Sequence, residues 1–454
     1  MNPSFPVMPS GPIDAYRASL LDFSNDPRHN AAACRWHADG LLLIRAGRVL
    51  AAGAYADLVG QLDATTAVHD YREHIICPGL IDTHVHYPQT DIVASPAPGL
   101  LPWLDNYTFL AERRFEDPVH ARAVASFFLD ELMRCGTTTA MVYCTVHAQS
   151  AQAFFAESAA RNLRMVAGKV LMDRNCPEFL RDTAESGARD TAALIEQWHH
   201  NGRQMVAITP RFAPTSSDAQ LQLAGELAQQ YPDTYIQTHV AENRDEVAWV
   251  AALYPDARSY LDVYERFGLL RQRAMYGHCI WLDQTDRQRM HASGAAVALC
   301  PTSNLFLGSG LFDFAAADAA DLSLSLATDV GGGTAFSLLQ TMNALYKVAR
   351  MGGVHLPATR MFYLATLGAA RAMRLEGTIG NFTPGAEADF IVIDPRATPM
   401  LARRSAASES LEEQLFALAL LADDRAIAAT YIAGRCAHRR DGLALGEEAA
   451  RTSG

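Results

Sequence analysis

Histidine and acidic side chains stand at or just after the ends of four short apolar runs in this 454-residue chain. In chain order they are His84, His86, His239, Glu242, His278 and Asp329. Imidazole and carboxylate groups without a thiolate suit an open catalytic zinc site better than a closed structural one. These residue types therefore predict a metal centre for hydrolytic chemistry.

Four of these side chains have the donor atoms of a zinc site. His84 and His86 are two residues apart, so both point from the same face of one strand. His239 would supply a third nitrogen and Asp329 an oxygen. Taken singly, an HxH pair occurs by chance in many proteins, and an Asp before Val-Gly is usually a turn or a cap. Their joint position at strand ends is what favours a site.

The remaining groups fit proton transfer. Zinc lowers the pKa of a bound water to about 7, and Glu242 lies where it would move that proton. Asp329 would orient the water or accept a proton from it. The role of His278 stays open between a metal ligand and a hydrogen-bond partner of the water and the intermediate.

A strand-then-helix alternation runs through the middle of the chain. The predicted strands are Gly79–His84, Thr138–Tyr143, Met165–Leu171, Met205–Thr209, Tyr235–His239, Met275–His278, Ala296–Cys300 and Leu324–Asp329. The predicted helices include Ala121–Cys135, Ala151–Leu163, Ala192–His200, Ala219–Gln230, Thr285–Ser293 and Phe336–Arg350. Eight such units favour a (β/α)₈ TIM barrel, whose active site lies at the C-terminal ends of its strands. A doubly wound open sheet alternates in the same way, so the count alone does not decide.

The two ends of the chain have a different pattern. Residues 38–77 and 379–438 contain short strands broken by Gly, which a barrel does not use. We expect them to pair into one small β-domain that flanks the barrel. The predicted division is residues 1–77 and 379–454 for this domain and 78–378 for the barrel.

Composition limits the partners. The formal net charge of −12 argues against a nucleic-acid or anionic-membrane surface. No apolar stretch reaches the length of a membrane span, and the first twenty residues lack the pattern of a signal peptide. Eight cysteines without a CxxC pair fit a reducing cytoplasm.

Several metal and phosphate motifs are missing from the sequence. It has no HExxH of a zincin protease, no PCxxC of the cytidine-deaminase type and no GxxxxGK[ST] phosphate loop. The run Gly331-Gly332-Gly333 follows Asp329 directly. We expect it to make room for a substrate beside the metal rather than to bind phosphate.

With these residues assembled, the chain resembles the amidohydrolase superfamily. The motif PGLIDTHVH, from Pro78 to His86, is that family's hallmark, and THVAE, YGHC, TDVG and FTPGAEADFIVID resemble its other signature segments. The resemblance implies a distorted barrel with a metal at its mouth. Binuclear members carry a bridging carboxylated Lys on strand 4, but strand 4 here has none, and Lys169 sits short of the end of strand 3. One zinc per chain is therefore expected.

Within the superfamily, the chain is most similar to the guanine deaminase family. The similarity lies in YPQ after HVH, in MDRN, in TPRFAPT, in QTHVAEN and in CPTSNL, and it extends from about Ala15 to Ala437. It implies hydrolytic deamination of guanine to xanthine and ammonia by a homodimer. By the same resemblance, the residues that hold the purine are Gln89, Arg211 and Phe212, next to the ligand His239.

Two alternatives remain open from the sequence. One is another aminohydrolase of the superfamily, acting on a different purine, a pterin or a triazine. In the sequence, only the substrate-binding residues, chiefly Gln89 and Arg211, distinguish that function from guanine deamination. The other is a non-catalytic barrel used as a scaffold, which is disfavoured because such relatives lose metal ligands and this chain keeps them.

Overall fold

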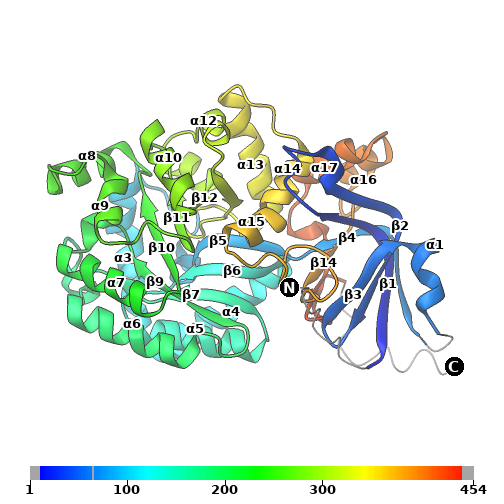
Figure 1. Ribbon diagram of the computed structural model, residues 1–454, viewed down its shortest axis with the longest axis horizontal. Helices are drawn as coiled ribbons and strands as arrows, with labels where there is room; N and C mark the ends of the chain where they lie inside the picture. The colour runs from blue at the N-terminus through cyan, green and yellow to red at the C-terminus, as the bar shows by residue number, and fades with distance from the viewer. Residues whose placement is uncertain (1–10, 64–65, 442–454) are drawn as a thin grey trace, which may run out of the picture.

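The computed structural model describes residues 11–63 and 66–441. It contains a barrel of parallel strands surrounded by helices and a second sheet at one side of it (Figure 1). The blue N-terminal strands and the orange-red C-terminal elements lie side by side in that second sheet, although they are far apart in sequence.

The barrel strands pair in parallel, each with the next along the chain. Within the described residues the eight strands on this path are β5 (Leu80–His86), β6 (Thr137–Tyr143), β7 (Arg164–Gly168), β9 (Gln204–Pro210), β10 (Tyr235–Val240), β11 (Ala274–His278), β12 (Ala296–Leu299) and β13 (Ser323–Leu326). Between β13 and β5 the hydroxyls of Thr83 and Ser325 lie 2.8 Å apart, and the Asp329 N–H donates to the His84 carbonyl at 2.9 Å. These bonds close the barrel where ladder pairing stops.

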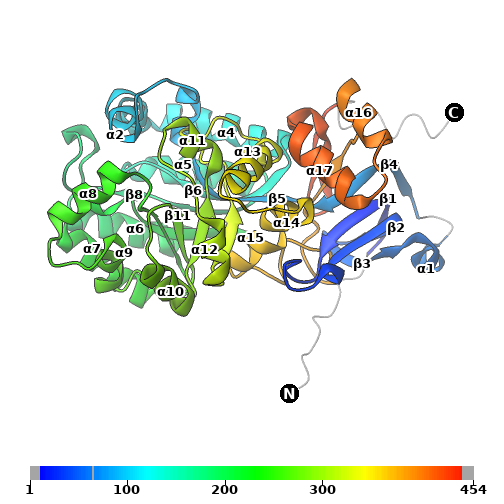
Figure 2. The same cartoon turned by 90° about the horizontal axis from the view of Figure 1, so that it is seen from above.

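Helices that follow the strands cover the outside of the barrel (Figures 1 and 2). They are α4 (Pro118–Arg134), α5 (Ala148–Ala160), α6 (Ala184–Trp198), α7 (Asp218–Gln230), α8 (Arg244–Leu253), α9 (Tyr260–Arg266), α10 (Gln284–Ser293), α11 (Pro301–Phe306), α12 (Phe314–Ala319) and α13 (Leu338–Met351). Side-chain caps fix where several begin; Thr183 and Asn243, for example, start α6 and α8 with capping boxes. The short helices α2 (Leu100–Trp103) and α3 (Phe109–Arg113) lie in the long connection after β5.

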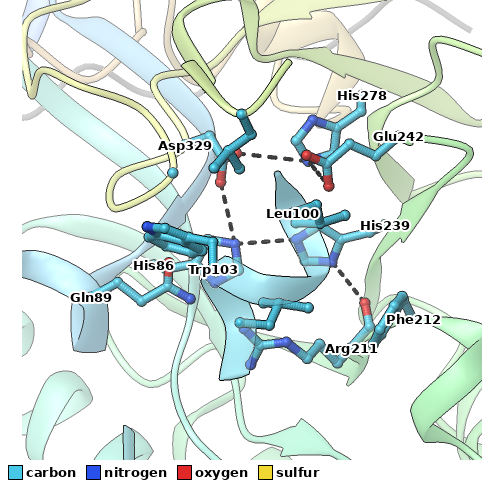
Figure 3. Close-up of a pocket in the computed structure, with 13 residues that line it drawn as sticks. His86, Gln89, Leu100, Trp103, Arg211, Phe212, His239, Glu242, His278 and Asp329 are labelled. Carbon is cyan, nitrogen blue, oxygen red and sulfur yellow. Dashed lines mark hydrogen bonds and ion pairs between the residues drawn. The ribbon is translucent and has the colours of Figure 1, made fainter. Parts of the chain in front are cut away.

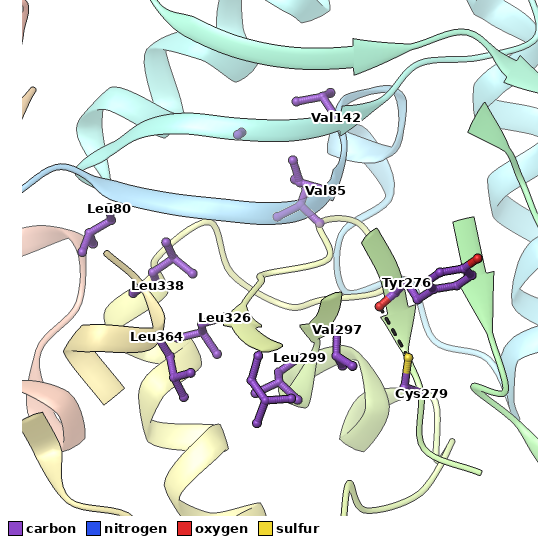
Figure 4. Close-up of a cluster of buried hydrophobic side chains, with 14 of the residues drawn as sticks. Leu80, Val85, Val142, Tyr276, Cys279, Val297, Leu299, Leu326, Leu338 and Leu364 are labelled. Carbon is purple, nitrogen blue, oxygen red and sulfur yellow. Dashed lines mark hydrogen bonds between the residues drawn. The ribbon is translucent and has the colours of Figure 1, made fainter. Parts of the chain in front are cut away.

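The core has two layers because alternate residues of a barrel strand point inward and outward. Leu80, Val85 and Val142 point toward the helices and pack in the cluster that Figure 4 shows, together with Leu338 of α13. Inside the barrel a separate cluster fills the lumen, including Ile81, Met141, Val166, Ala207 and Met275. The barrel is therefore a packed core and not an open pore.

The second sheet is built from both ends of the chain, as predicted. Its strands are β1 (Ile13–Phe23), β2 (Cys34–Arg45), β3 (Arg48–Ala54), β4 (Val68–Pro78), β14 (Phe390–Ile393), β15 (Ile427–Ile432) and β16 (Arg435–Arg439), in the order β16-β15-β14-β4-β1-β2-β3. The junction is the antiparallel pairing of β14 with β4. The short α1 (Tyr55–Leu58) follows β3. The division at residues 77/78 and 378/379 stays a prediction, and residues 1–10 and 442–454 of its outer parts lie outside the described range.

Four helices connect the barrel to the end of the chain. They are α14 (Ala358–Leu364), α15 (Leu367–Ala372), α16 (Pro399–Ala406) and α17 (Leu411–Leu421), and α17 packs against α13 and α14 (Figure 2). Over residues 11–63 and 66–441, no helix combines the length and the apolar character that crossing a membrane requires.

The third and the eighth predicted strands end three residues earlier than expected. The third was expected to run unbroken to Leu171, but it ends at Gly168, and a two-residue strand, β8 (Val170–Leu171), pairs with β9 instead. Lys169 stands at the break, buried and paired with Asp182 at 2.6 Å, and the apolar residues Val170 and Leu171 after it are buried in the short strand β8. The eighth was expected to end at Asp329, but ladder pairing stops at Leu326.

Candidate active site

The barrel brings the residues predicted to bind metal or to transfer protons to one rim, at the C-terminal ends of its strands. Figure 3 shows five of them: His86, His239, Glu242, His278 and Asp329. His84 and His86 belong to β5, and His239 and His278 to the ends of β10 and β11. Asp329 lies three residues past β13, in the loop, and not at the strand end. Its backbone N–H bond to the His84 carbonyl places it beside β5 nevertheless.

The backbone leaves the strands sharply at this rim. His278 and Asp329 have φ of 69° and 53°, in the left-handed region that non-Gly residues seldom occupy. Asp82 anchors the turn after β13, because its carboxylate accepts from the Thr328 hydroxyl and from the Thr328 N–H at 3.1 Å. Such conformations cluster at functional sites when the surroundings enforce them.

Four donor atoms converge at the centre of the rim. The Nε2 atom of His86 lies 3.4 Å from that of His84 and 3.2 Å from that of His239. Asp329 Oδ1 is 3.4 Å from His84 Nε2 and 3.3 Å from His86 Nε2. All four side chains are largely buried. The lone pairs of these nitrogen and oxygen atoms repel one another at such short distances unless a cation lies between them. The four side chains therefore have the chemistry of a metal site.

Hydrogen bonds at the far side of two rings fix which nitrogen faces the centre. His239 Nδ1 lies 2.7 Å from the Arg211 carbonyl, to which it can only donate, so Nε2 carries the lone pair. His278 Nδ1 likewise donates to Asn304 Oδ1 at 2.8 Å, and its buried Nε2 has no hydrogen-bond partner among the described residues. Burial lowers the pKa of His86 to about 3, which keeps that ring neutral.

Two other groups of ligand-type residues fit a metal less well. Cys300 lies near the same centre, but its thiol donates to the Ala298 carbonyl at 3.4 Å. His199, His200 and Asp233 cluster away from this rim. There His199 Nδ1 accepts from the Val206 N–H at 3.1 Å, so its Nε2 keeps the proton in the neutral ring.

Glu242 lines the same pocket as His86, His239 and Asp329 and lies beside His278. Its carboxylate is 3.4 Å from His278 Nε2 and accepts from the Ser309 hydroxyl at 3.0 Å. Burial, and next the negative charge of Asp329, raise the pKa of Glu242 to about 8. A carboxyl group with a pKa near neutrality can both accept and release a proton at working pH.

The predicted substrate residues line the same pocket. Gln89, Arg211 and Phe212 surround it together with His86, His239, Glu242, His278 and Asp329. Its remaining wall is apolar and comes from Leu100 and Trp103 of α2 (Figure 3), Leu104 directly after α2 and Leu307 directly after α11. Gly332 also lines it, where a Cβ would come within 2.8 Å of Ser303 Oγ, so the glycine leaves room beside Asp329. One pocket thus joins polar groups, an aromatic side chain and the candidate metal centre.

Three residues that the sequence did not single out hold this site in shape. Asn304 orients His278, Ser309 bonds to Glu242, and Glu112 bonds to both Arg211 and Gln89. Asn304 belongs to the motif CPTSNL, which resembles the guanine deaminase family, so the sequence could have pointed to it as a site residue. Glu112 stands in the charged run AERRFED, which has the pattern of a solvated helix face, so no local signal marks it.

Comparison with known proteins gives the family. The model of the amidohydrolase family matches residues 75–437, which is most of the chain. The chain belongs to the amidohydrolase family.

Several similar proteins and solved structures are guanine deaminases. The chain is 47% identical to the guanine deaminase of Escherichia coli (strain K12) over 94% of this chain and 98% of that protein. It is 38% identical to a probable guanine deaminase of Deinococcus radiodurans over 94% and 99%. The E. coli structure superposes with a TM-score of 0.92, covering 94% of this chain and all of that one. The structure of a guanine deaminase from C. acetobutylicum with guanine bound in its active site has a TM-score of 0.83 at 25% identity, covering 93% of this chain and 99% of that one.

Proposed function

We propose that this protein is a guanine deaminase, a hydrolase that converts guanine and water to xanthine and ammonia. The observation that carries the proposal is the pocket itself, which is lined by the histidines and Asp329 of the candidate metal centre, by the buried Glu242 and by Arg211. The relatives named above support guanine as the substrate because the similarity extends over nearly the whole of each chain.

We assign one zinc ion per chain to His84, His86, His239 and Asp329. A tetrahedral zinc with Zn–N distances of about 2.0–2.1 Å would have ligand atoms roughly 3.3–3.4 Å apart. The spacings of 3.2–3.4 Å between these donor atoms fit that value. A zinc ion at such a site supplies a water whose pKa is lowered to about 7.

Glu242 would carry protons in the reaction. The C2–N bond of guanine breaks and a C2–O bond forms. The attacking water gives up both of its protons, one to the ring nitrogen beside C2 and one to the departing amine. Glu242 lies next to both His278 and Asp329 and is shielded from solvent, so it can take the first proton and deliver it to the substrate. His278, held by Asn304, would hydrogen-bond the oxygen that attacks.

Arg211, Gln89 and Phe212 would hold the purine. A guanidinium offers only donors and cannot lose its proton at working pH. It therefore suits the 6-oxo group of guanine, whereas the 6-amino group of adenine would leave buried donors facing each other. Gln89 can donate and accept along the ring edge, and Phe212 offers a flat apolar contact.

A substrate panel tests the proposed function. Ammonia release should be fast with guanine and nearly absent with adenine, pterin and melamine, since a missing complementary partner costs discrimination of about 10⁴-fold. Comparable rates on guanine and adenine would contradict the assignment and leave an aminohydrolase of another purine, a pterin or a triazine.

We further propose a homodimer in the reducing cytoplasm. The family resemblance supports the dimer, and the eight cysteines, all within the described residues, are unpaired as expected for that compartment. Light scattering on the purified protein would measure the first, and fractionation of the source cells the second.

A further inference from the structure

A carboxylate with no solvent exposure lies directly behind the pocket. Glu112 belongs to α3, one helical turn after Phe109, and is 0% exposed. Its Oε1 accepts from Arg211 Nη1 at 2.8 Å and from Gln89 Nε2 at 3.0 Å, and its Oε2 accepts from the same Arg211 Nη1 at 2.8 Å. A buried charge is stable only with such partners, so its position and theirs depend on one another.

The contact with Arg211 uses only one end of the guanidinium. Nη1 makes both bonds to Glu112, and the Arg211 carbon Cζ lies 5.6 Å from the Phe109 ring centre. Nη2 and Nε make no hydrogen bond with any described residue. Since Arg211 lines the pocket, these remaining donors are left for a ligand (Figure 3).

The contact with Gln89 decides which way its amide faces. Nε2 donates to Glu112, and Oε1 accepts from the Gly331 N–H at 3.3 Å. A flipped amide would set its oxygen against the carboxylate and its NH₂ against an N–H, so the observed orientation is the favourable one. Gln89 therefore presents a defined pattern of one further N–H and one further lone pair.

Glu112 also balances the charge of the pocket wall. Of the described residues that line the pocket, Arg211 is the only Lys or Arg. A buried guanidinium without a carboxylate partner binds anions strongly. With Glu112 beside it, the pair is neutral overall and offers donors without a net charge.

We propose that Glu112 is a positioning and specificity-determining residue, which holds Arg211 and Gln89 in place and makes the pocket select a neutral oxopurine over an anionic purine. This inference rests on the proposed function for the identity of the ligand class. Glu112 does not reach the metal-type centre through any hydrogen bond, so it acts through the two residues that it orients.

The experiment measures binding by the zinc-loaded enzyme without turnover. Hypoxanthine is a neutral 6-oxopurine that lacks the amino group to be removed, and purine-6-carboxylate carries an anion at the same ring position. Dissociation constants for both are measured by calorimetry for wild type, Glu112→Gln and Glu112→Asp. Guanine kinetics and thermal unfolding are recorded in parallel.

A matched control lies at the opposite rim of the barrel. Glu387 is also a buried carboxylate held by arginines, at 2.6 Å from Arg203 and 2.5 Å from Arg164, but it lies at the N-terminal ends of the strands. Glu387→Gln therefore removes the same charge from the same kind of cluster without touching the pocket.

Glu112→Gln should weaken hypoxanthine and tighten purine-6-carboxylate, moving the ratio of their dissociation constants by about 10²-fold or more. Glu112→Asp keeps the charge, so the ratio should stay within about 10-fold of wild type while KM for guanine rises and kcat changes little. Glu387→Gln should leave the ratio unchanged and lower only the stability.

A purely structural role gives a different result. If Glu112→Gln lowers the unfolding temperature but leaves the ratio within about threefold of wild type, the inference is overturned. If that variant does not fold, an unchanged KM in Glu112→Asp overturns it instead. Wild type that releases no ammonia from guanine would refute the proposed function, whereas the two dissociation constants still decide the role of Glu112.

Discussion

The two rims of the barrel both carry buried polar and charged side chains, but they differ in how many of these groups have a hydrogen-bond partner. At the N-terminal rim, the Glu387 carboxylate accepts from Arg164 through both of its oxygens and from Arg203 through Oε2. Asp389 beside it accepts from Arg203 and, at 2.7 Å, from the Ala433 N–H. This cluster joins the barrel to the second sheet, and its carboxylate oxygens are satisfied within the protein.

At the C-terminal rim, some buried polar groups have donors or acceptors that no described residue satisfies. His278 Nε2, which faces the centre of the site, is buried and has no hydrogen-bond partner among the described residues. Arg211 keeps free donors toward the pocket although it is paired with Glu112. Unsatisfied buried polar groups cost free energy, so a protein retains them where a ligand completes them. The comparison separates a rim that stabilises the fold from a rim that binds and reacts.

The largest expected effect comes from the metal-type residues. His84→Ala or Asp329→Ala should lower zinc content and abolish turnover, and a chelator should do the same to wild type, because both remove a ligand that the other donors cannot replace. Elemental analysis should give about one zinc per chain. His200→Ala, in the cluster away from the site, is the control and should keep its zinc; two tightly held metals, both needed for activity, would contradict the single-ion assignment.

Glu242→Gln should separate proton transfer from metal binding. The variant should keep its zinc and its fold, while kcat falls by about 10²–10⁴-fold, the usual worth of a general acid–base group. Ser309→Ala, which removes only one hydrogen bond to Glu242, should cost about 3–10-fold. Near wild-type turnover of Glu242→Gln would transfer the proton-carrying role to His278 or Asp329.

Arg211→Ala should act on substrate choice. We expect kcat/KM for guanine to fall by at least about 10²-fold, because the donors that match the 6-oxo group are lost. Zinc content should not change. Steady-state kinetics on guanine and adenine measure this, and unchanged guanine kinetics would remove Arg211 from the binding site.

Glu387→Gln should have the smallest effect on turnover and a clear one on stability. Kinetic constants should stay within about twofold of wild type, while the free energy of unfolding at pH 7 falls by about 2–3 kcal/mol, since hydrogen bonds to charged partners are lost. Urea unfolding monitored by circular dichroism measures this. A large loss of activity at unchanged stability would erase the distinction between the rims.

The same variant has a pH signature. Although burial alone raises the pKa of Glu387, its bonds to Arg164 and the charge of Arg203 lower it below the usual 4.5. A lowered folded-state pKa gives stability that is present above the unfolded value and is lost as pH falls through the folded one. The stability difference between wild type and Glu387→Gln should therefore be full at pH 7 and shrink below pH 4.5.

Much of the fold could be predicted because its signals are local. Apolar β-branched runs followed by helical patterns give the strand–helix units, and the Gly-broken strands at both ends give the second sheet. The break in the third strand could not be predicted, because it depends on the pairing of Lys169 with Asp182 and of β8 with β9. The position of Asp329 past the end of β13 depends likewise on its bond to β5.

The sequence by itself determined which side chains can reach one rim, since residue type and strand periodicity fix the face on which His84 and His86 lie. Only the tertiary structure decided which groups complete them. Glu112 and Arg211 are 99 residues apart, and Ser309 and Glu242 are 67 apart. A buried carboxylate in a charged run looks like a surface residue until packing removes it from water, and no local pattern encodes which distant donor it will then meet.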